Sequence, residues 1–169
     1  MQAPAVTLSR ALDPELRVQH ALDLAFGYLT RRDRTVLEMR RYLEGKRVEP
    51  CAIDDALAHL EREDYLNDAR FARQFADDKR LLEEWGADRI ERRLLALGVP
   101  AALAAAAVGA RERGGELEAA CALLRRRFPG LDGDPRERRR AYGVLVRKGY
   151  DPELAWEAIR AHVGGGIDD

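Results

Sequence analysis

Arginine is the residue type with the clearest chemical potential in this chain, because it supplies almost all of the positive charge. Lysine occurs only at Lys46, Lys79 and Lys148, among 29 basic residues. A row of guanidinium groups on one helix face binds phosphate through Coulomb attraction and counterion release, without reading bases. The same pattern also fits an ordinary solvated helix face, so spacing alone leaves both interpretations open.

Two segments sort their arginines onto one side of a predicted helix. In 87–97, Ile90, Leu94 and Leu97 form an apolar stripe, and arginines flank it at about 100° per residue. In 135–148, arginines recur at spacings of four and seven residues opposite an apolar side. These arginines are Arg89, Arg92 and Arg93 in the first segment, and Arg136, Arg139, Arg140 and Arg147 in the second.

Gly143 lies in the same line as the arginines of 135–148. A glycine inside a helix costs roughly 1 kcal/mol against alanine, so its presence calls for a reason. We hypothesise that the bare backbone at Gly143 lets an anion or a partner chain come close.

The charges of the chain are segregated, although the formal net charge is only −1. Residues 49–68 contain seven acidic residues and one arginine, whereas residues 125–148 contain nine basic and three acidic residues. The basic segment can face an anion while the acidic segment faces a basic partner.

Residue patterns that support catalysis are missing from the sequence. There is no phosphate-binding loop of the Gly-x-x-x-x-Gly-Lys-Ser/Thr type. Each histidine is isolated on a predicted helix, and the adjacent acids point in different directions around a helix, so neither set converges. The residues concerned are His20, His59 and His162, and the pairs Asp54–Asp55, Asp77–Asp78 and Glu83–Glu84. We predict no enzymatic activity, no metal and no cofactor.

Cysteine usage and hydropathy favour a cytoplasmic protein. Cys51 and Cys121 are far apart and lack metal-ligand spacing, so we interpret them as buried small apolar residues rather than a disulfide. The N-terminus has no apolar core of signal-peptide length, and no run approaches the length of a membrane span.

Periodicity and capping residues predict an all-α protein. Thr35 and Glu38 form a capping-box pattern, and Asn67 is placed to cap the helix that follows. Inside that helix the expected inward positions are Phe71, Ala72, Phe75, Ala76 and Leu82, with the stem of Lys79.

An internal repeat organises the predicted helices. A helix ending in glycine, followed by an apolar residue and then a proline that opens the next helix, occurs at Gly98-Val99-Pro100 and at Gly149-Tyr150-Asp151-Pro152, and more loosely at 45–50. We predict three tandem three-helix, helix-turn-helix-like repeats at 15–66, 67–110 and 111–163, in an elongated, curved arrangement. A flexible arm at 1–14, a disordered tail at 164–169 and a hinge at Gly114-Gly115 complete this organisation. A single irregular helical bundle is the alternative.

The central stretch of the chain resembles the signature of the RecX family, whose members regulate the recombinase RecA. The resemblance is specific over 65–98 and extends over about 21–160. It rests on Tyr65-Leu66-Asn67-Asp68-Ala69-Arg70-Phe71-Ala72, on Arg80, and on Gly86-Ala87-Asp88-Arg89-Ile90 with Leu94 and Gly98. Asp64 stands where the family usually has glycine, and Asn67 stands where it usually has aspartate.

This resemblance implies a non-enzymatic, monomeric modulator that lodges in the RecA filament on single-stranded DNA and lowers its ATP hydrolysis and strand exchange. Naked single- or double-stranded DNA would bind weakly, and no membrane is involved. The implied functions are DNA repair, homologous recombination and the SOS response. The residues expected to face the filament are Arg70, Arg80, Arg89, Arg92, Arg93, Arg125, Arg126, Arg136, Arg139, Arg140, Arg147 and Lys148.

Two other functions remain open from the sequence. Three-helix units resemble helix-turn-helix modules, so the chain could be a DNA-binding transcriptional regulator with a basic helix in a major groove. It could also be a scaffold that makes no contact with nucleic acid.

Overall fold

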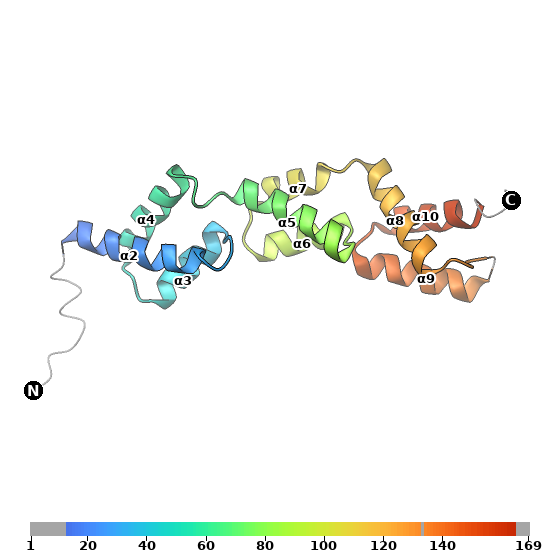
Figure 1. The fold of residues 1–169 in the computed structure, drawn as a ribbon, viewed down its shortest axis with the longest axis horizontal. Coiled ribbons are helices and arrows are strands. Elements are labelled where there is room, and N and C mark those ends of the chain that lie inside the picture. Colours follow the sequence, from blue (N-terminus) through green and yellow to red (C-terminus); the bar gives the residue numbers. More distant parts are fainter. Residues whose placement is uncertain (1–12, 133, 165–169) are drawn as a thin grey trace, which may run out of the picture. The chain divides into compact units, whose positions relative to one another are not determined.

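The computed structural model describes residues 13–132 and 134–164. Within these ranges the chain forms nine α-helices and no β-strand, which confirms the predicted all-α class (Figure 1). The helices are α2 (Pro14–Leu29), α3 (Val36–Gly45), α4 (Pro50–Arg62), α5 (Asp68–Glu83), α6 (Ala87–Ala96), α7 (Ala101–Gly109), α8 (Arg113–Arg127), α9 (Pro135–Lys148) and α10 (Pro152–Gly164). Most of the expected arm and tail, at 1–12 and 165–169, lies outside the described residues.

The helices follow one another in three groups of three, and the chain divides into two compact units. Unit 1 comprises residues 1–71 with 97–99, and unit 2 comprises residues 72–96 with 100–169. The group α2–α4 therefore belongs to unit 1, and the group α8–α10 to unit 2. Helix α5 begins in unit 1 and continues in unit 2.

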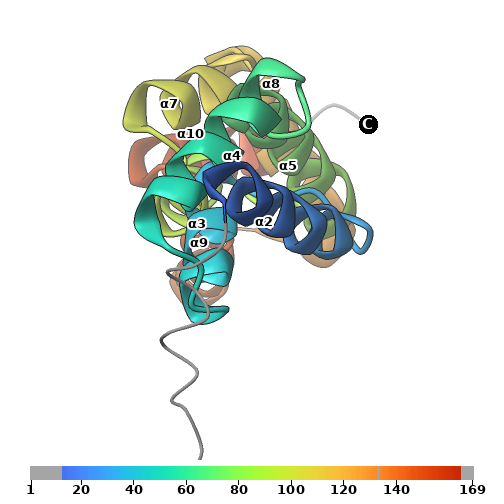
Figure 2. The same cartoon turned by 90° about the vertical axis from the view of Figure 1, so that its left-hand side faces the viewer.

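Unit 1 is built on the apolar side of its three helices, which pack beside one another (Figures 1 and 2). Met39 and Leu43 from α3 meet Ile53, Leu57 and Leu60 from α4, and all five side chains are buried. Within each helix these residues recur at spacings of three or four, as the apolar side of an α-helix requires. The capping box is confirmed, since Thr35 Oγ1 accepts from the Glu38 amide and the Glu38 carboxylate accepts from the Thr35 amide.

Local capping also sets the start of α5. Asn67 Oδ1 accepts a hydrogen bond of 2.8 Å from the Arg70 amide, as predicted. The next residue, Asp68, accepts 2.9 Å from the amide of Val36 at the start of α3. Burial raises the pKa of the Asp68 carboxyl.

Unit 2 contains a second apolar core, where α10 packs on both α8 and α9. Leu124, Leu145, Tyr150 and Ile159 lie inside it. The part formed by α5–α7 is filled with smaller side chains, including Ala72, Ala76, Ala104 and Ala107. These alanines let helices approach closely but bury little apolar area each.

Three expectations about individual residues are wrong. Helix α8 begins at Arg113, so Gly114 and Gly115 lie in its first turn instead of forming a hinge. Glu116 explains this, because it is buried and its carboxylate accepts 2.8 Å from the Ala87 amide, which fixes the turn.

The other two corrections concern Leu82 and Cys51. The buried positions of α5 recur every four residues up to Arg80, so Leu82 lies about 200° farther round the helix and is 75% exposed. Cys51 is exposed at the start of α4, whereas Cys121 is half-buried and burial raises the pKa of its thiol. Both cysteines are free thiols, as predicted.

Candidate nucleic-acid interface

The twelve cations predicted to bind divide into two groups in the structure. Eight are exposed, and seven of these eight form no ion pair with a carboxylate of the described residues, the exception being Arg126. These seven are Arg92, Arg93, Arg125, Arg136, Arg139, Arg140 and Arg147. The remaining five have protein partners that fix their side chains.

Helix α9 carries the largest set of free cations. Asp134 caps it by accepting 3.0 Å from the Arg136 amide, and Pro135 occupies its first turn, a position that suits proline. Ala141 and Leu145 are fully buried on one side. The opposite side is left to Arg136, Arg139, Arg140 and Arg147.

The space beside Gly143 lies next to one of the free arginines. A Cβ atom added there would lie 3.1 Å from Nη1 of Arg147, one helical turn farther on. The bare backbone at Gly143 therefore leaves room for the Arg147 guanidinium, and a close approach by an anion or a partner chain stays a hypothesis.

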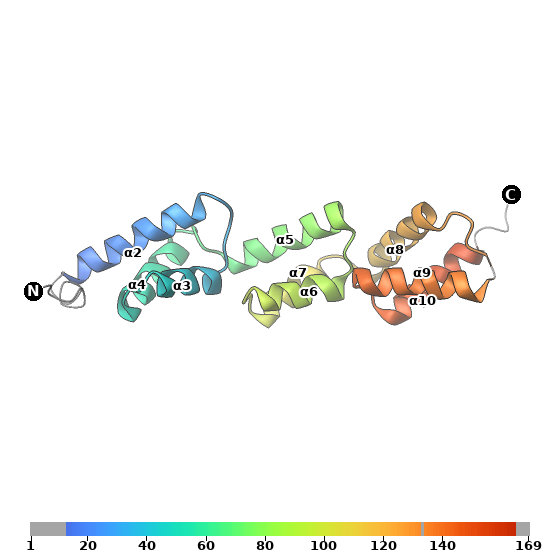
Figure 3. The same ribbon diagram turned by 90° about the horizontal axis from the view of Figure 1, so that it is seen from below.

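Helices α6 and α9 lie end to end within unit 2 (Figure 3). The Gly86 amide donates to the Lys148 carbonyl at 2.9 Å, and the Asp88 amide donates to the Gly149 carbonyl at 3.1 Å. The first N–H groups of α6 and the last carbonyls of α9 lack intrahelical partners, so each helix satisfies the other. We call this contact the α6–α9 joint.

Arg89 is part of the α6–α9 joint. Its guanidinium lies 4.0 Å from the centre of the Trp85 ring and donates 3.0 Å to the Arg147 carbonyl. Its Cβ would be 2.2 Å from a Cβ added to Gly149, whose φ is +92°. Arg89 is thus a structural residue, while Arg92 and Arg93 on the same helix are exposed.

Lys148 and Arg126 also support the α6–α9 joint. Lys148 Nζ donates to the Glu83 carbonyl at the end of α5, at 2.5 Å. Arg126 donates 2.7 Å to the carboxylate of Glu84, and this hydrogen bond holds the pKa of Glu84 below its usual value. Both cations therefore connect the third helix group to the end of α5.

Arg80 does not belong to any exposed surface, although the sequence placed it among the binding residues. It is 9% exposed, and its Nη2 donates 2.7 Å to the Val108 carbonyl at the end of α7. Burial lowers its pKa from the ordinary arginine value. Arg70, in unit 1, pairs with the Asp64 carboxylate and donates 2.8 Å to the Asp64 carbonyl.

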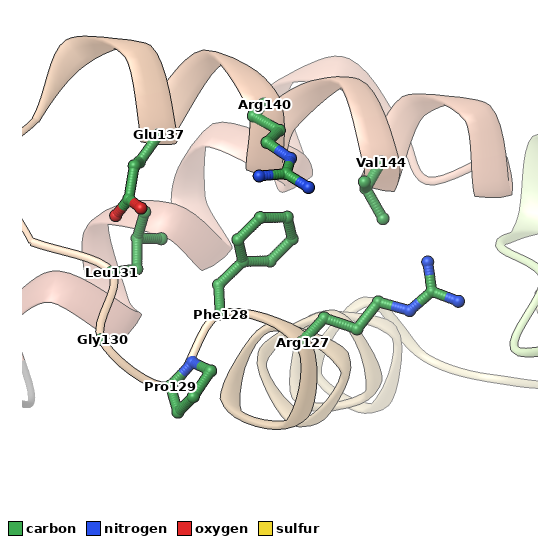
Figure 4. Close-up of a pocket in the computed structure, with 8 residues that line it drawn as sticks. All are labelled: Arg127, Phe128, Pro129, Gly130, Leu131, Glu137, Arg140 and Val144. Atoms are coloured by element: carbon green, nitrogen blue, oxygen red, sulfur yellow. The ribbon is translucent and has the colours of Figure 1, made fainter.

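A groove with a volume of about 350 Å³ lies beside the arginines of α9 (Figure 4). Arg127 and Phe128 line it from the end of α8, and Glu137, Arg140 and Val144 line it from α9. The sequence did not single out Arg127 or Phe128 as candidate site residues. The three consecutive arginines 125–127 were a signal for Arg127, whereas Phe128 follows the buried Leu124 by four residues, as an interior residue of the helix would.

An aromatic pair was also missed. The rings of Tyr142 in α9 and Trp156 in α10 stack with centroids 4.7 Å apart, and Trp156 is 40% exposed. Nothing in the spacing of either residue distinguished it from an ordinary core aromatic.

Within residues 13–132 and 134–164, no three His, Cys, Asp or Glu side chains gather in a way that could hold a metal ion. None of the helices in this part is both long enough and apolar enough to cross a membrane.

Comparisons with known proteins agree with one another. Three family models match in tandem, and they describe the first, second and third three-helix domains of RecX at residues 21–60, 67–108 and 115–159. A protein named regulatory protein RecX from Xanthomonas campestris is 35% identical over 152 residues, covering 89% of this chain and 90% of that protein. Another of the same name from Amycolatopsis mediterranei is 31% identical and covers 88% and 86%.

Solved structures are similar in fold. The crystal structure of RecX from Lactobacillus salivarius matches with a TM-score of 0.77 and 19% identity, over 86% of this chain and 96% of that one. A crystal structure described as regulatory protein RecX matches with a TM-score of 0.74 and 17% identity, over 94% and 79%.

Proposed function

This chain belongs to the RecX family, and we propose that it binds the RecA filament on single-stranded DNA and lowers its ATP hydrolysis and strand exchange. The action is regulatory and needs no chemistry of its own. The relatives are named regulatory proteins, which supports this interpretation. We further propose that the protein acts as a monomer in the cytoplasm, during recombination and DNA repair.

The observation that carries the proposal is the row of arginines on α9, whose charges have no carboxylate partner in the described part of the chain. A cation that already forms an ion pair within the protein attracts a phosphate only weakly, because the neighbouring carboxylate offsets its charge. Free guanidinium groups on a rigid helix can instead displace counterions from a DNA backbone. Arg92 and Arg93 supply two more exposed cations on α6, on the other side of the α6–α9 joint.

Helix α6 also helps to fix the position of α9 and its arginines. Its N-terminal amides are bonded to α9, and Ala87 is bonded to Glu116 in α8. Because these bonds join the second and third helix groups within unit 2, they hold α6 and α9, and with them their cations, in fixed positions relative to one another. A rigid surface loses less conformational entropy on binding than a flexible one.

The direct test is a titration of RecA ATPase activity on single-stranded DNA with the purified protein. We expect inhibition at amounts well below those of RecA. The variant Arg136→Glu/Arg139→Glu should weaken inhibition by about tenfold or more, because it replaces attraction to phosphate with repulsion. The matched control is Arg73→Glu/Arg160→Glu, which reverses two exposed charges of unit 2 that lie outside α6 and α9.

Arg89 is left unchanged in these variants, since its loss would disturb the α6–α9 joint. Equal inhibition by the α9 variant and the control would remove α9 from the contact. No effect of the wild-type protein on RecA would contradict the proposed function as a whole. A strong preference for one duplex sequence, together with no effect on RecA, would instead favour a transcriptional regulator.

A further inference from the structure

The groove beside α9 has different chemistry at its two ends. Figure 4 shows the Phe128 ring in the middle, with the Arg140 guanidinium over it and Glu137 at the side of Leu131. Arg127 approaches from the end of α8, away from Glu137. One end is therefore cationic, the middle is apolar, and the other end offers a carboxylate.

The cations of the groove come from two helices, with Arg127 at one end and Arg140 over the Phe128 ring. Arg127 and Arg140 are both exposed, and neither pairs with a carboxylate of the described residues. Two contacts meet at the Phe128 carbonyl, where α8 ends. His162 Nε2 lies 2.9 Å from the Phe128 carbonyl, and the Leu131 amide donates 3.1 Å to that same carbonyl. These contacts fix the backbone on which Phe128 is mounted.

We propose that this groove holds one nucleotide of a single-stranded nucleic acid. The phosphate binds Arg127 and Arg140, and the base lies along Phe128 and Leu131. The inference rests on the proposed function, because it names the component of the filament that the α9 surface touches. A volume of about 350 Å³ is at the lower end of small-ligand sites, which suits a single base with its phosphate.

Three features favour a single strand over the other occupants. In a duplex the faces of the bases are stacked on one another, so a base cannot lie against a side-chain ring without being extruded. An acidic peptide would pair with the arginines but has no base to lie along Phe128 and Leu131. The cations also continue beyond the groove, since Arg136 and Arg147 lie about 16 Å apart along α9, which suits a polyanion longer than one nucleotide.

Glu137 assigns an orientation to the nucleotide. Its carboxylate can accept hydrogen bonds from the exocyclic amine of cytosine or adenine, and thymine has no such amine. It would repel a phosphate, so the phosphate belongs at the opposite end with the arginines. We therefore expect oligo-dC to bind more tightly than oligo-dT, and Glu137→Gln to reduce this difference.

The test uses fluorescence anisotropy of short labelled oligodeoxynucleotides with the full-length protein. Arg127→Gln/Arg140→Gln should lower the affinity for oligo-dC about tenfold and reduce the logarithmic salt slope by about 0.7, the value for one phosphate on a single strand. Phe128→Leu should lower the affinity about fivefold or more, the loss expected for one stacked base, with the salt slope unchanged. Thermal melts confirm that each variant is folded.

The matched control is Arg73→Gln/Arg160→Gln, which removes two exposed charges from unit 2 outside the groove. The proposal is overturned if the groove variant loses no more affinity than this control, or if the wild-type protein does not bind the oligonucleotide. It is also overturned if Phe128→Leu binds like the wild type. Binding of a polyglutamate peptide, lost in the groove variant while DNA binding is kept, would identify an acidic peptide as the occupant.

The RecA ATPase assay separates this inference from the proposed function. Inhibition that persists in the wild type without groove-dependent DNA binding contradicts the inference alone. Groove-dependent DNA binding without any inhibition by the wild type contradicts the proposed function alone. Equal affinities for oligo-dC and oligo-dT would overturn the orientation assigned through Glu137.

Discussion

The α6–α9 joint and the groove between α8 and α9 both contain arginines, yet the arginines serve opposite purposes. At the joint, Arg89 stacks on Trp85 and donates to a backbone carbonyl. At the groove, Arg127 and Arg140 are exposed and have no carboxylate partner in the described chain. The two regions belong to the same unit and share α9.

The difference comes from the backbone that each arginine meets. Helix C-termini present carbonyls without intrahelical partners, and a guanidinium can donate several hydrogen bonds to them. Arg89 meets the end of α9, and Arg80 meets the end of α7. Arg140 also lies beside a helix end, that of α8, but among the described residues it donates no hydrogen bond to a carbonyl there. Its hydrogen-bonding capacity therefore stays available for an external anion.

The largest expected effect is a break of the joint by Gly149→Ala. The residue has a φ of +92°, and the new Cβ would lie 2.2 Å from Arg89 Cβ and 2.6 Å from the Arg89 backbone nitrogen. Strain and overpacking together should lower the free energy of unfolding by about 3 kcal/mol or more. Urea denaturation measures this loss.

Gly109→Ala is the control for that substitution, since a Cβ there meets nothing within 4 Å. If Gly149→Ala unfolds at the same urea concentration as Gly109→Ala, the joint does not hold the two helix groups together.

A smaller loss of stability is expected from Arg80→Met. Methionine keeps the apolar stem but leaves the Ala107 and Val108 carbonyls without their donors. The substitution also removes the buried Arg80 Nε, which has no hydrogen-bond partner in the described part of the chain, and this offsets part of the loss. We therefore expect the free energy of unfolding to fall by about 1.5 kcal/mol. Arg73→Met, on an exposed position of the same helix, should change the melting temperature little. An equal shift for both would mean that burial of Arg80 contributes nothing.

Alkaline pH should weaken the same region. Tyr150 follows Gly149 and is buried, and burial raises its pKa to about 12 from an unfolded value near 10. The unfolded chain therefore releases this proton first. The stabilisation is complete below pH 10 and falls by roughly 2 kcal/mol between pH 10 and 12. Denaturation of the wild type and of Tyr150→Phe at several pH values isolates this contribution, and parallel curves would contradict it.

The smallest effect is expected on the exposed face of α9, from Gly143→Ala. The neighbouring atoms belong to the flexible end of Arg147, which can move aside, so the helix should gain about 0.5–1 kcal/mol. Oligonucleotide affinity should change by less than about twofold, because the guanidinium stays exposed. A thermal melt and an anisotropy titration check both statements, and a large loss of affinity would support a binding role for this glycine.

Much of the fold was predictable because it depends on local chemistry. The capping box at Thr35 and Glu38, the Asn67 cap and the Asp134–Pro135 start of α9 are each set by residues within a few positions of one another. The three-group organisation followed from a short glycine-to-proline pattern repeated along the chain. The hinge expected at Gly114-Gly115 was wrong because it ignored the contact between Glu116 and Ala87, which are far apart in sequence. The expectation for Leu82 was wrong because this residue lies off the buried side of α5.

The candidate site was only partly predictable. The sequence identified α9 as a basic helix, and the structure leaves most of its arginines exposed. It could not distinguish Arg80 from these, because Arg80 is fixed by carbonyls 27 and 28 residues away. Phe128 likewise had the periodicity of an interior residue, and its place in a groove depends on Arg140 from another helix.

The sequence by itself determined which segments become helices and, for most of them, where they begin and which side turns inward, since these follow from spacing and capping within a few residues. Only the tertiary structure decided which cations are occupied and which are free. An arginine is fixed within the protein when it reaches the unpaired carbonyls at the end of another helix. Which arginines reach such carbonyls depends on how the helices pack.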